Sequence, residues 1–503
     1  MVGILDMSEY ENINRRDFLK RLVGLSAAPF LFFLSDAMGQ EQPPNVILIS
    51  IDSLRADHLG CYRYPKTTSP NIDSLANEGV VFTNAISTTT WTLPAHISML
   101  TSLYPEVHQV IHDGKKLSDR AVVCAEIMKE AGYLTAGFVS GPYLSSKFGY
   151  NQGFDLYDDY TINYSSNEAS HHGITSPQIH RQVIKWLKQS YRSPFFLFIH
   201  YWDVHYDYAP PPPFDAMFDP DYTGTITGED YERNERINPQ MPKRALEHII
   251  ALYDGEIAFT DSYIGKLMKH LKHLGVYDNT MIILTSDHGD EFFEHGHKCH
   301  RNNLFDETLR VPLIIKFPSG RGGPASLNPL RRRLNQQVSI VDIVPTFLDY
   351  LGITPDSALD GQSLMPLIAD AETLAHSKPY CFADLHGLMK CVRTNQFKYI
   401  HIARQQKSRK KGMRRFSLHR LFDKLKEHHD MRVGEKTLLF DLQYDPEERH
   451  NLAASNPEIQ IKMHRILMNW LSEAKILAAN IGKSNFEYDE DLKRKLTDLG
   501  YIQ

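Results

Sequence analysis

The sequence has little cysteine and no long hydrophobic run. Its five cysteines include no C-x-x-C pair. Such an odd and sparse set predicts neither a disulfide framework nor a thiolate metal site, although it is compatible with a single bridge. No apolar run reaches the roughly 18 residues that a membrane-spanning helix needs. We therefore expect a mature protein without a stable membrane span, long enough at 503 residues for one α/β domain and a smaller one.

A strong excess of charge is also missing. The net charge of −6 gives no indication of nucleic-acid binding. It conceals one basic segment, residues 404–426, where ten Lys or Arg and a single Asp give a local charge of +9. Solvated charge is the ordinary interpretation of such a run. The alternative is a flap that holds a polyanionic substrate or a membrane surface.

The N-terminus has the pattern of an export signal. N-R-R-D-F-L-K at 14–20 precedes the apolar run Leu22–Leu34 and the small residues at 37–39. The pair Arg15-Arg16 resembles a twin-arginine signal, which implies a signal peptide over 1–39, the twin-arginine export machinery as a partner, and a periplasmic or extracellular enzyme. The alternative is a short membrane anchor or an amphipathic helix. However, 13 residues that include Gly24 and Pro29 are too few to span a bilayer comfortably.

Strand-like apolar runs alternate with helical patterns through most of the chain. This alternation predicts an α/β fold with a doubly wound, largely parallel sheet. The expected strands are 45–51, 134–140, 195–201, 280–285 and 312–317, and the expected helices are 71–78, 118–131, 178–189 and 243–274. After about residue 378, the segments 389–402 and 437–442 predict antiparallel strands, and a helix follows over 457–478.

Two acidic strings stand at the ends of predicted strands. The run Thr280–Leu284 leads to Asp287, His288 and a turn at Gly289, and the run N-V-I-L-I-S-I leads to Asp52. Open α/β sheets place ligands at the carboxyl ends of their strands. A carboxylate and an imidazole at such an end favour a metal site, and a capped strand end is the structural alternative.

These strings resemble the sulfatase family of the alkaline-phosphatase superfamily. The resemblance continues through T-S-P-N-I-D-S-L-A-N-E-G-V-V-F-T-N-A (68–85), L-P-A-H-I-S-M-L-T-S-L-Y-P (93–105), V-D-I-V-P-T-F-L-D-Y-L-G (341–352) and L-F-D-L-Q-Y-D-P-E-E-R-H-N-L-A (439–453). It implies an alkaline-phosphatase-like catalytic domain over 44–378. A C-terminal α+β subdomain over 379–480 would carry the basic insertion 404–426, and a polar tail would follow over 481–503.

The resemblance implies one divalent cation, bound by Asp52, Asp287, His288 and Thr92. Many members have a second Asp where this chain has Ser53. Ca²⁺ or Mg²⁺ is the ion expected from the family, and the imidazole also suits Mn²⁺ or Zn²⁺. No second metal trio can be placed on the sequence.

The nucleophile position departs from the family pattern. Sulfatases have C/S-x-P-x-R, whose first residue becomes formylglycine, whereas this chain reads Thr92-Leu93-Pro94-Ala95-His96. We expect no formylglycine, because Thr cannot form it. Relatives in the superfamily use Thr at this position, so Thr92 is a candidate nucleophile at a helix N-terminus; a simple helix cap is the alternative.

Several further side chains match family positions around the ester. His205 and His300 are candidates for contacting the anion and protonating the leaving group. Four others are candidate substrate-binding or orienting residues, namely His96, His108, Asp113 and Arg55; for Arg55 a plain salt bridge is an equal alternative.

The predicted function is hydrolysis of an anionic ester. One divalent ion against Asp52 and Asp287 leaves a nearly neutral centre, which favours a monoanionic group such as a sulfate ester, phosphodiester or phosphonate ester. The rivals are a phospho-group transferase and a non-catalytic anion-binding homologue.

Overall fold

The computed structural model describes residues 42–159, 175–319, 332–369, 379–403, 437–485 and 489–498. The predicted signal peptide and the basic segment 404–426 lie outside these residues. Contacts divide the chain into two units, Met1–Pro44 and Asn45–Gln503. Everything below concerns the second unit. No helix in the described part is long and apolar enough to cross a membrane.

The centre of the fold is a nine-stranded sheet in the order β11-β2-β10-β7-β1-β6-β4-β5, with β12 beside β2. Strands β7, β1, β6, β4 and β5 are parallel, whereas β10 runs antiparallel to both β7 and β2. The predicted doubly wound, largely parallel sheet is therefore confirmed. The strands are β1 (Asn45–Ile51), β2 (Val80–Ile86), β4 (Leu134–Phe138), β5 (Leu156–Asp158), β6 (Phe195–Tyr201), β7 (Thr280–Ser286), β10 (Arg310–Lys316), β11 (Arg332–Leu334) and β12 (Val338–Ser339).

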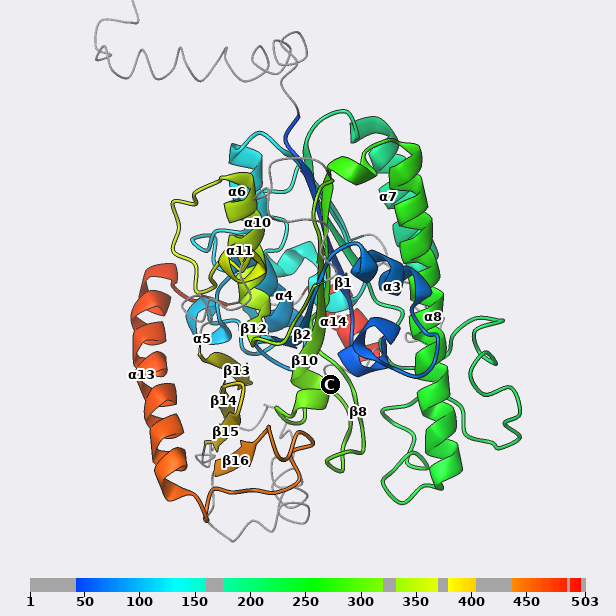
Figure 1. Ribbon diagram of the computed structural model, residues 1–503, viewed down its shortest axis with the longest axis vertical. Helices are drawn as coiled ribbons and strands as arrows, with labels where there is room; N and C mark the ends of the chain where they lie inside the picture. The colour runs from blue at the N-terminus through cyan, green and yellow to red at the C-terminus, as the bar shows by residue number, and fades with distance from the viewer. Residues whose placement is uncertain are drawn as a thin grey trace, which may run out of the picture. The chain divides into compact units, whose positions relative to one another are not determined.

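Helices cover both faces of this sheet (Figure 1). One face packs against α3 (Pro70–Asn77), α7 (Ser176–Ser190) and α8 (Lys243–His273), and the other against α4 (Thr92–Thr101), α6 (Cys124–Glu130) and α10 (Ile343–Leu351). Strand β1 shows why. Its side chains alternate between the faces, so Val46 and Leu48 join one hydrophobic core and Ile47 and Ile49 the other. A strand buried on both sides reads as the continuous apolar run seen in the sequence.

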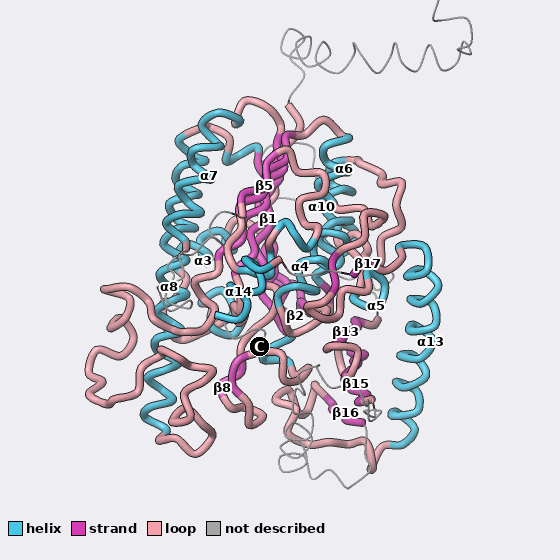
Figure 2. Tube along the Cα trace, turned by 180° about the vertical axis from the view of Figure 1, so that it is seen from behind, coloured by secondary structure: helices cyan, strands magenta, loops and turns pink. Residues whose placement is uncertain are grey.

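The C-terminal region forms a separate antiparallel sheet with a long helix, as the sequence predicts. Strands β13 (Cys381–Leu385), β14 (Met389–Arg393), β15 (Phe397–Ile402) and β16 (Thr437–Asp441) pair in chain order. Helix α13 (Pro457–Ile481) lies beside them (Figure 2). Phe382 stacks on Trp470 of this helix, with ring centroids 4.2 Å apart.

A buried ionic cluster joins the two sheets. Asp306, in the short helix α9 (Asp306–Leu309), accepts from Arg393 at 2.6 Å and from Lys398 at 2.8 Å. Lys398 also pairs with Glu448 at 2.9 Å. Burial opposes ionisation of Asp306, but the two cations outweigh it and hold its pKa well below the usual range. The charges are paired, so burying them does not leave an isolated ion.

Smaller elements complete the described structure. They are α5 (Pro105–His108), α11 (Met365–Ala369), α14 (Glu490–Asp498), the pairs β3 (Lys115–Lys116) with β17 (Ser484–Asn485) and β8 (Glu291–Phe292) with β9 (Lys298–Cys299), and the 3-10 turns Ala56–His58, Gly60–Tyr62, Pro142–Leu144, Ser146–Phe148, Tyr277–Asn279 and Ile340–Asp342.

One expectation about local structure was wrong, and one strand was missed. The helix expected over 118–131 begins only at Cys124, because the segment before it makes tertiary hydrogen bonds: Leu117 N–H donates to Phe148 O and the Ser118 hydroxyl to Ile481 O. Strand β2 was not predicted, although V-V-F is a typical strand run. All five cysteines are unpaired, so the single bridge that the sequence left open does not form.

Candidate functional site

The register of the central strands brings two carboxylates together. Ile51 is the partner of Ser286 in the parallel pair β1–β7. The next residues along the two strands are Asp52 and Asp287, so both side chains emerge at the same edge of the sheet. This is the carboxyl edge, where open α/β sheets place ligands. Both residues are fully buried, as is His288.

Asp52, Asp287 and His288 form a compact group of potential metal ligands. One ligand atom from each lies within 4.8 Å of the others. His288 Nε2 is 3.3 Å from Asp287 Oδ2 and 3.9 Å from Asp52 Oδ1. Ser53 bonds both carboxylates: its hydroxyl donates to Asp52 Oδ1, and its backbone N–H donates to Asp287 Oδ1. Asp287 Oδ2 is buried and has no hydrogen-bond partner.

The electrostatics of this group fit a divalent cation. Burial raises the pKa of Asp52 to about 6, and burial together with Asp52 raises the pKa of Asp287. Burial opposes protonation of His288, but Asp287 and Asp52 outweigh it and raise its pKa. Two buried carboxylates thus have only one imidazole to balance their negative charge. A buried oxygen without a partner and two uncompensated carboxylates are what a metal ion satisfies.

Thr92 is the first residue of α4 and faces this group. Its Oγ1 lies 3.5 Å from Asp52 Oδ2 and 3.4 Å from His288 Nε2. The first backbone N–H groups of a helix have no intrahelical acceptor, and the helix dipole makes this end positive. At Thr92, a hydroxyl thus lies beside Asp52 and His288 and at the positive end of a helix, where an anion can bind. The side chain is only 6% exposed.

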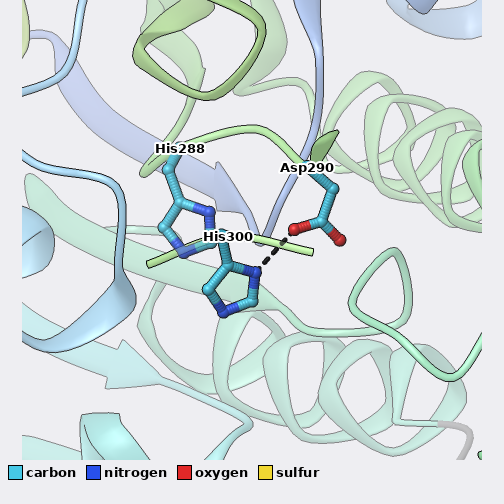
Figure 3. A group of neighbouring side chains, drawn as sticks. All are labelled: His288, Asp290 and His300. Carbon is cyan, nitrogen blue, oxygen red and sulfur yellow. Dashed lines mark hydrogen bonds and ion pairs between the residues drawn. The ribbon is translucent and has the colours of Figure 1, made fainter. Parts of the chain in front are cut away.

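His300 is oriented by a carboxylate that the motif analysis did not select. Its Nδ1 lies 2.6 Å from Asp290 Oδ1, and Asp290 Oδ2 accepts from the Tyr208 hydroxyl at 2.6 Å. Figure 3 shows the second ring nitrogen of His300 pointing away from Asp290. The rings of His300 and His288 are 4.3 Å apart. Burial, His288 and Arg301 hold the pKa of His300 well below its ordinary value, so the ring is neutral with its Nδ1 proton directed to Asp290.

Two other predicted residues lie in the same neighbourhood. The ring of His205 is 5.1 Å from that of His300. His96 lies next to Asp287 and Thr92. Its Nδ1 is 3.6 Å from Asp287 Oδ2 and 2.9 Å from Thr92 O, and its Nε2 bonds Ser50 Oγ at 2.9 Å. His96 is completely buried, and burial lowers its pKa to about 3. It holds Thr92 and Asp287 in place as a neutral ring.

The structure does not bring His108 and Arg55 into this group. His108 is buried in α5, where its ring bonds Ser98 Oγ at 3.1 Å and accepts from the Val110 N–H. Arg55 pairs with Asp57 and Glu294 and donates to the carbonyl of Asp290. It thereby supports the loop that contains Asp290. Asp113 is half-buried and acts electrostatically on Arg301, the neighbour of His300.

His200 and Asp290 were missed by sequence reasoning. His200 Nε2 lies 3.5 Å from Asp52 Oδ2 and has no hydrogen-bond partner, while its Nδ1 bonds Ser140 O at 2.7 Å. A signal was present, because His200 interrupts the apolar run F-F-L-F-I-H-Y of β6. Asp290 follows Gly289 directly, but its partner His300 is ten residues away across the β8–β9 pair.

A second group of potential ligands, His288, Asp290 and His300, shares His288 with the first. A third contains Glu291, His295 and Glu307, in which His295 Nδ1 already bonds Glu307 at 2.7 Å. Hydrogen bonds within these two groups account for their geometry without an ion.

The sheet is largely parallel, and its carboxyl edge carries buried carboxylates and an imidazole beside a hydroxyl at the start of a helix. These features define a hydrolase of sulfuric or phosphoric esters with an alkaline-phosphatase-like fold. The chain belongs to the sulfatase family, since the family model named Sulfatase matches residues 44–353. This family is metal-dependent, and Asp52, Asp287 and His288 are the candidate ligands here.

Known relatives agree with this assignment. An ulvan-active sulfatase from Formosa agariphila is 26% identical over 392 residues, which cover 72% of this chain and 73% of that protein. The phosphonate monoester hydrolase of Agrobacterium radiobacter has a similar fold, with a TM-score of 0.64, 23% identity, and coverage of 86% and 96%. A protein solved with its substrate D-glucosamine-2-N,6-O-disulfate gives a TM-score of 0.66, 20% identity, and coverage of 87% and 99%.

Proposed function

We propose that the protein hydrolyses a sulfate ester, or a phosphodiester or phosphonate ester, with Thr92 as the nucleophile. The observation that supports this best is the position of Thr92 Oγ1, within 3.5 Å of both Asp52 and His288 at the start of α4. The N-cap residue of α4 is Trp91, so Thr92 is already the first helical residue, and its hydroxyl contacts Asp52 and His288.

The ligands of one divalent cation would be Asp52, Asp287 and His288, together with Thr92. Ca²⁺ and Mg²⁺ are the ions we expect first, and Mn²⁺ and Zn²⁺ also suit this mixed oxygen and nitrogen set. The bound ion supplies Lewis-acid stabilisation of negative charge and makes a hydroxyl more acidic. Ser53 and His96 keep the two carboxylates oriented.

Thr92 Oγ attacks the sulfur or phosphorus, and the bond to the leaving oxygen breaks. The proton that the Thr92 hydroxyl gives up passes through His205 or His300 to the leaving oxygen. The N-terminus of α4 stabilises the charge that develops on the non-bridging oxygens. A Thr ester remains. Water then attacks the sulfur or phosphorus of this ester and gives a proton to the Nε2 atom of neutral His300. The bond to Thr92 Oγ breaks, and His300 returns the proton to Thr92 Oγ.

The substrate class follows from charge. Two aspartates against a divalent cation leave a nearly neutral centre, which suits a monoanionic ester better than a phosphate dianion. Relatives named for ulvan, for a disulfated glucosamine and for phosphonate monoesters are consistent with an anionic ester. His205, His300 and Asp113 would contact it.

We further propose export through the twin-arginine signal over 1–39, and the division into a catalytic domain over 44–378 and a subdomain over 379–480.

The test is Thr92→Val, which retains the shape and removes the hydroxyl. We expect turnover to fall by about 10³-fold or more, which corresponds to about 4 kcal/mol of transition-state stabilisation. Thr101→Val, at the other end of the same helix, is the matched control, because its buried hydroxyl donates to Ile97 O and accepts from the Leu103 N–H, away from Asp52 and His288. The substrates are 4-nitrophenyl sulfate, phosphate, bis-phosphate and phosphonate esters, each with Ca²⁺, Mg²⁺, Mn²⁺ and Zn²⁺.

Thr92→Ser should retain measurable turnover, since the hydroxyl remains. Full activity of Thr92→Val would show that Thr92 is only a helix cap. Transfer to an added alcohol in place of water would favour the transferase, and metal-free, inactive but anion-binding protein would favour the binding homologue.

A further inference from the structure

The guanidinium of Arg301, the residue after His300, has no carboxylate partner within the described part of the chain. Its Cζ is 4.7 Å from the ring centroid of Trp91 and 5.7 Å from that of Tyr143. Among the described residues, the guanidinium makes one long hydrogen bond of 3.5 Å, to the Tyr143 hydroxyl. The Nε atom is buried and has no acceptor. An arginine whose donors are unused, in a partly buried place, is energetically costly unless an acceptor arrives.

The fold holds this guanidinium next to the reacting groups. Arg301 directly follows His300, and its backbone N–H donates to Thr90 O at 3.0 Å. This bond fixes it against the loop that leads into Thr92. Trp91 is the residue before the nucleophile, so the cation stacked on Trp91 stands beside the start of α4.

The platform under Arg301 is built for a cation rather than for a substrate ring. Trp91 and Tyr143 are 1% and 2% exposed, so neither offers a face to solvent. Their rings meet edge to face at 5.5 Å, and His386 packs on Trp91 at 5.1 Å. Arg301, in contrast, is partly exposed. Arg301 also has a φ of +67°, a left-handed conformation that arginine rarely adopts, so the surrounding contacts impose this placement.

We propose that Arg301 is a subsite for a second anionic group of the substrate, a carboxylate or a sulfo group carried by the same molecule as the scissile ester. The planar guanidinium presents paired N–H donors that match such an oxyanion. Asp113 acts electrostatically on Arg301, and the Arg301 Nε donor stays available among the described residues. This inference rests on the proposed function, and it narrows the substrate to esters with a second negative charge.

The experiment compares matched esters that differ only in the second group. Phenyl, 3-carboxyphenyl and 3-sulfophenyl esters, and the neutral methyl ester of the carboxylate, are made with whichever ester group the enzyme cleaves. We expect the two anionic esters to be preferred. Arg301→Gln should lower kcat/KM roughly 10- to 100-fold for them, mostly through KM, and change the neutral esters less than about threefold. Arg301→Lys should recover part of the loss, because it retains the charge but not the fork.

Arg192→Gln is the control. Arg192 also stacks on a tyrosine, at 5.1 Å from the Tyr191 ring, but it precedes β6 at the opposite edge of the sheet, about 20 Å away. Equal losses for anionic and neutral esters in Arg301→Gln and Arg301→Lys, with an unchanged melting temperature, would overturn the subsite. So would a wild-type enzyme without preference. The proposed function is tested separately with the neutral esters. If the wild-type enzyme cleaves them and Thr92→Val does not, the proposed function stands whether or not the Arg301 subsite does.

Discussion

Replacing Asp290 with Asn should disable His300 while leaving the fold intact. Asp290 accepts one hydrogen bond from Tyr208 and one from His300, both at 2.6 Å. An amide oxygen can still accept from the Tyr208 hydroxyl. The amide nitrogen then faces His300 Nδ1 and donates to it, so the neutral ring must carry its proton on Nε2. The Nε2 lone pair that accepts a proton from water is lost.

The magnitude follows from comparable arrangements. In the Ser-His-Asp arrangement, the same carboxylate-to-amide change imposes the wrong tautomer and costs about 10⁴-fold in turnover. Since His300 acts here beside a metal site and a helix N-terminus, which continue to stabilise charge, we expect kcat to fall by about 10²- to 10⁴-fold. KM should change little, because the substrate contacts remain.

Stability should not fall with activity. Burial raises the pKa of Asp290 to about 6, so ionisation is on the order of 3 kcal/mol less favourable in the folded protein than in the unfolded chain. Asn avoids this cost, and the melting temperature should be unchanged or higher. The assay is steady-state turnover of the best ester, with thermal unfolding in parallel.

Tyr208→Phe is the matched control, because it removes the other hydrogen bond of Asp290 and leaves the tautomer of His300 unaffected. We expect its kcat within about tenfold of the wild type. An Asp290→Asn enzyme with kcat within threefold of the wild type would refute the orienting role, as would equal losses in the two variants.

Three further predictions concern the metal, the ionic cluster and export. Asp287→Asn should abolish activity, and elemental analysis should no longer find a stoichiometric divalent ion. Its melting temperature should not rise with added metal, since a bound ion stabilises the fold by mass action. Active wild-type protein without stoichiometric metal would contradict this. Asp306→Asn should lower the free energy of unfolding by about 3 kcal/mol near neutral pH, because it leaves two buried cations under-compensated. The pKa of Asp306 is lowered in the fold, so its contribution is present above the unfolded value of 3.8 and the difference between variant and wild type should shrink as pH falls below it; a pH-independent difference in denaturant unfolding would argue against the charge. Changing Arg15 and Arg16 together to Lys should leave the precursor in the cytoplasm on cell fractionation, and normal appearance of mature protein outside would indicate the general secretory route.

Much of the fold could be predicted from local patterns. The continuous apolar runs of β1, β6 and β7 and the long helix α8 carry strong periodicity, and the predicted bounds of α8 differ from the structure by one residue. Strand β2 was missed although its seven residues begin with the strand-like run V-V-F, whereas the two-residue strands β8 and β9 depend on their neighbours rather than on their own sequence.

Part of the candidate site could also be predicted from local patterns. Asp52, Thr92, Asp287 and His288 could be selected from the sequence, because each stands beside the end of a strand or the start of a helix, and parallel strands share one carboxyl edge. Sequence alone also indicated that Thr92 departs from the formylglycine pattern.

The tertiary structure alone decided which other groups meet at that edge. His200 reaches Asp52 from the neighbouring strand, Asp290 orients His300 across a hairpin, and Arg301 stacks on Trp91 from a distant loop. His108, which the motifs had placed at the mouth, is instead buried against Ser98. Such contacts join residues far apart in the chain, and their distances depend on strand register and packing, which periodicity and spacing along one sequence do not specify.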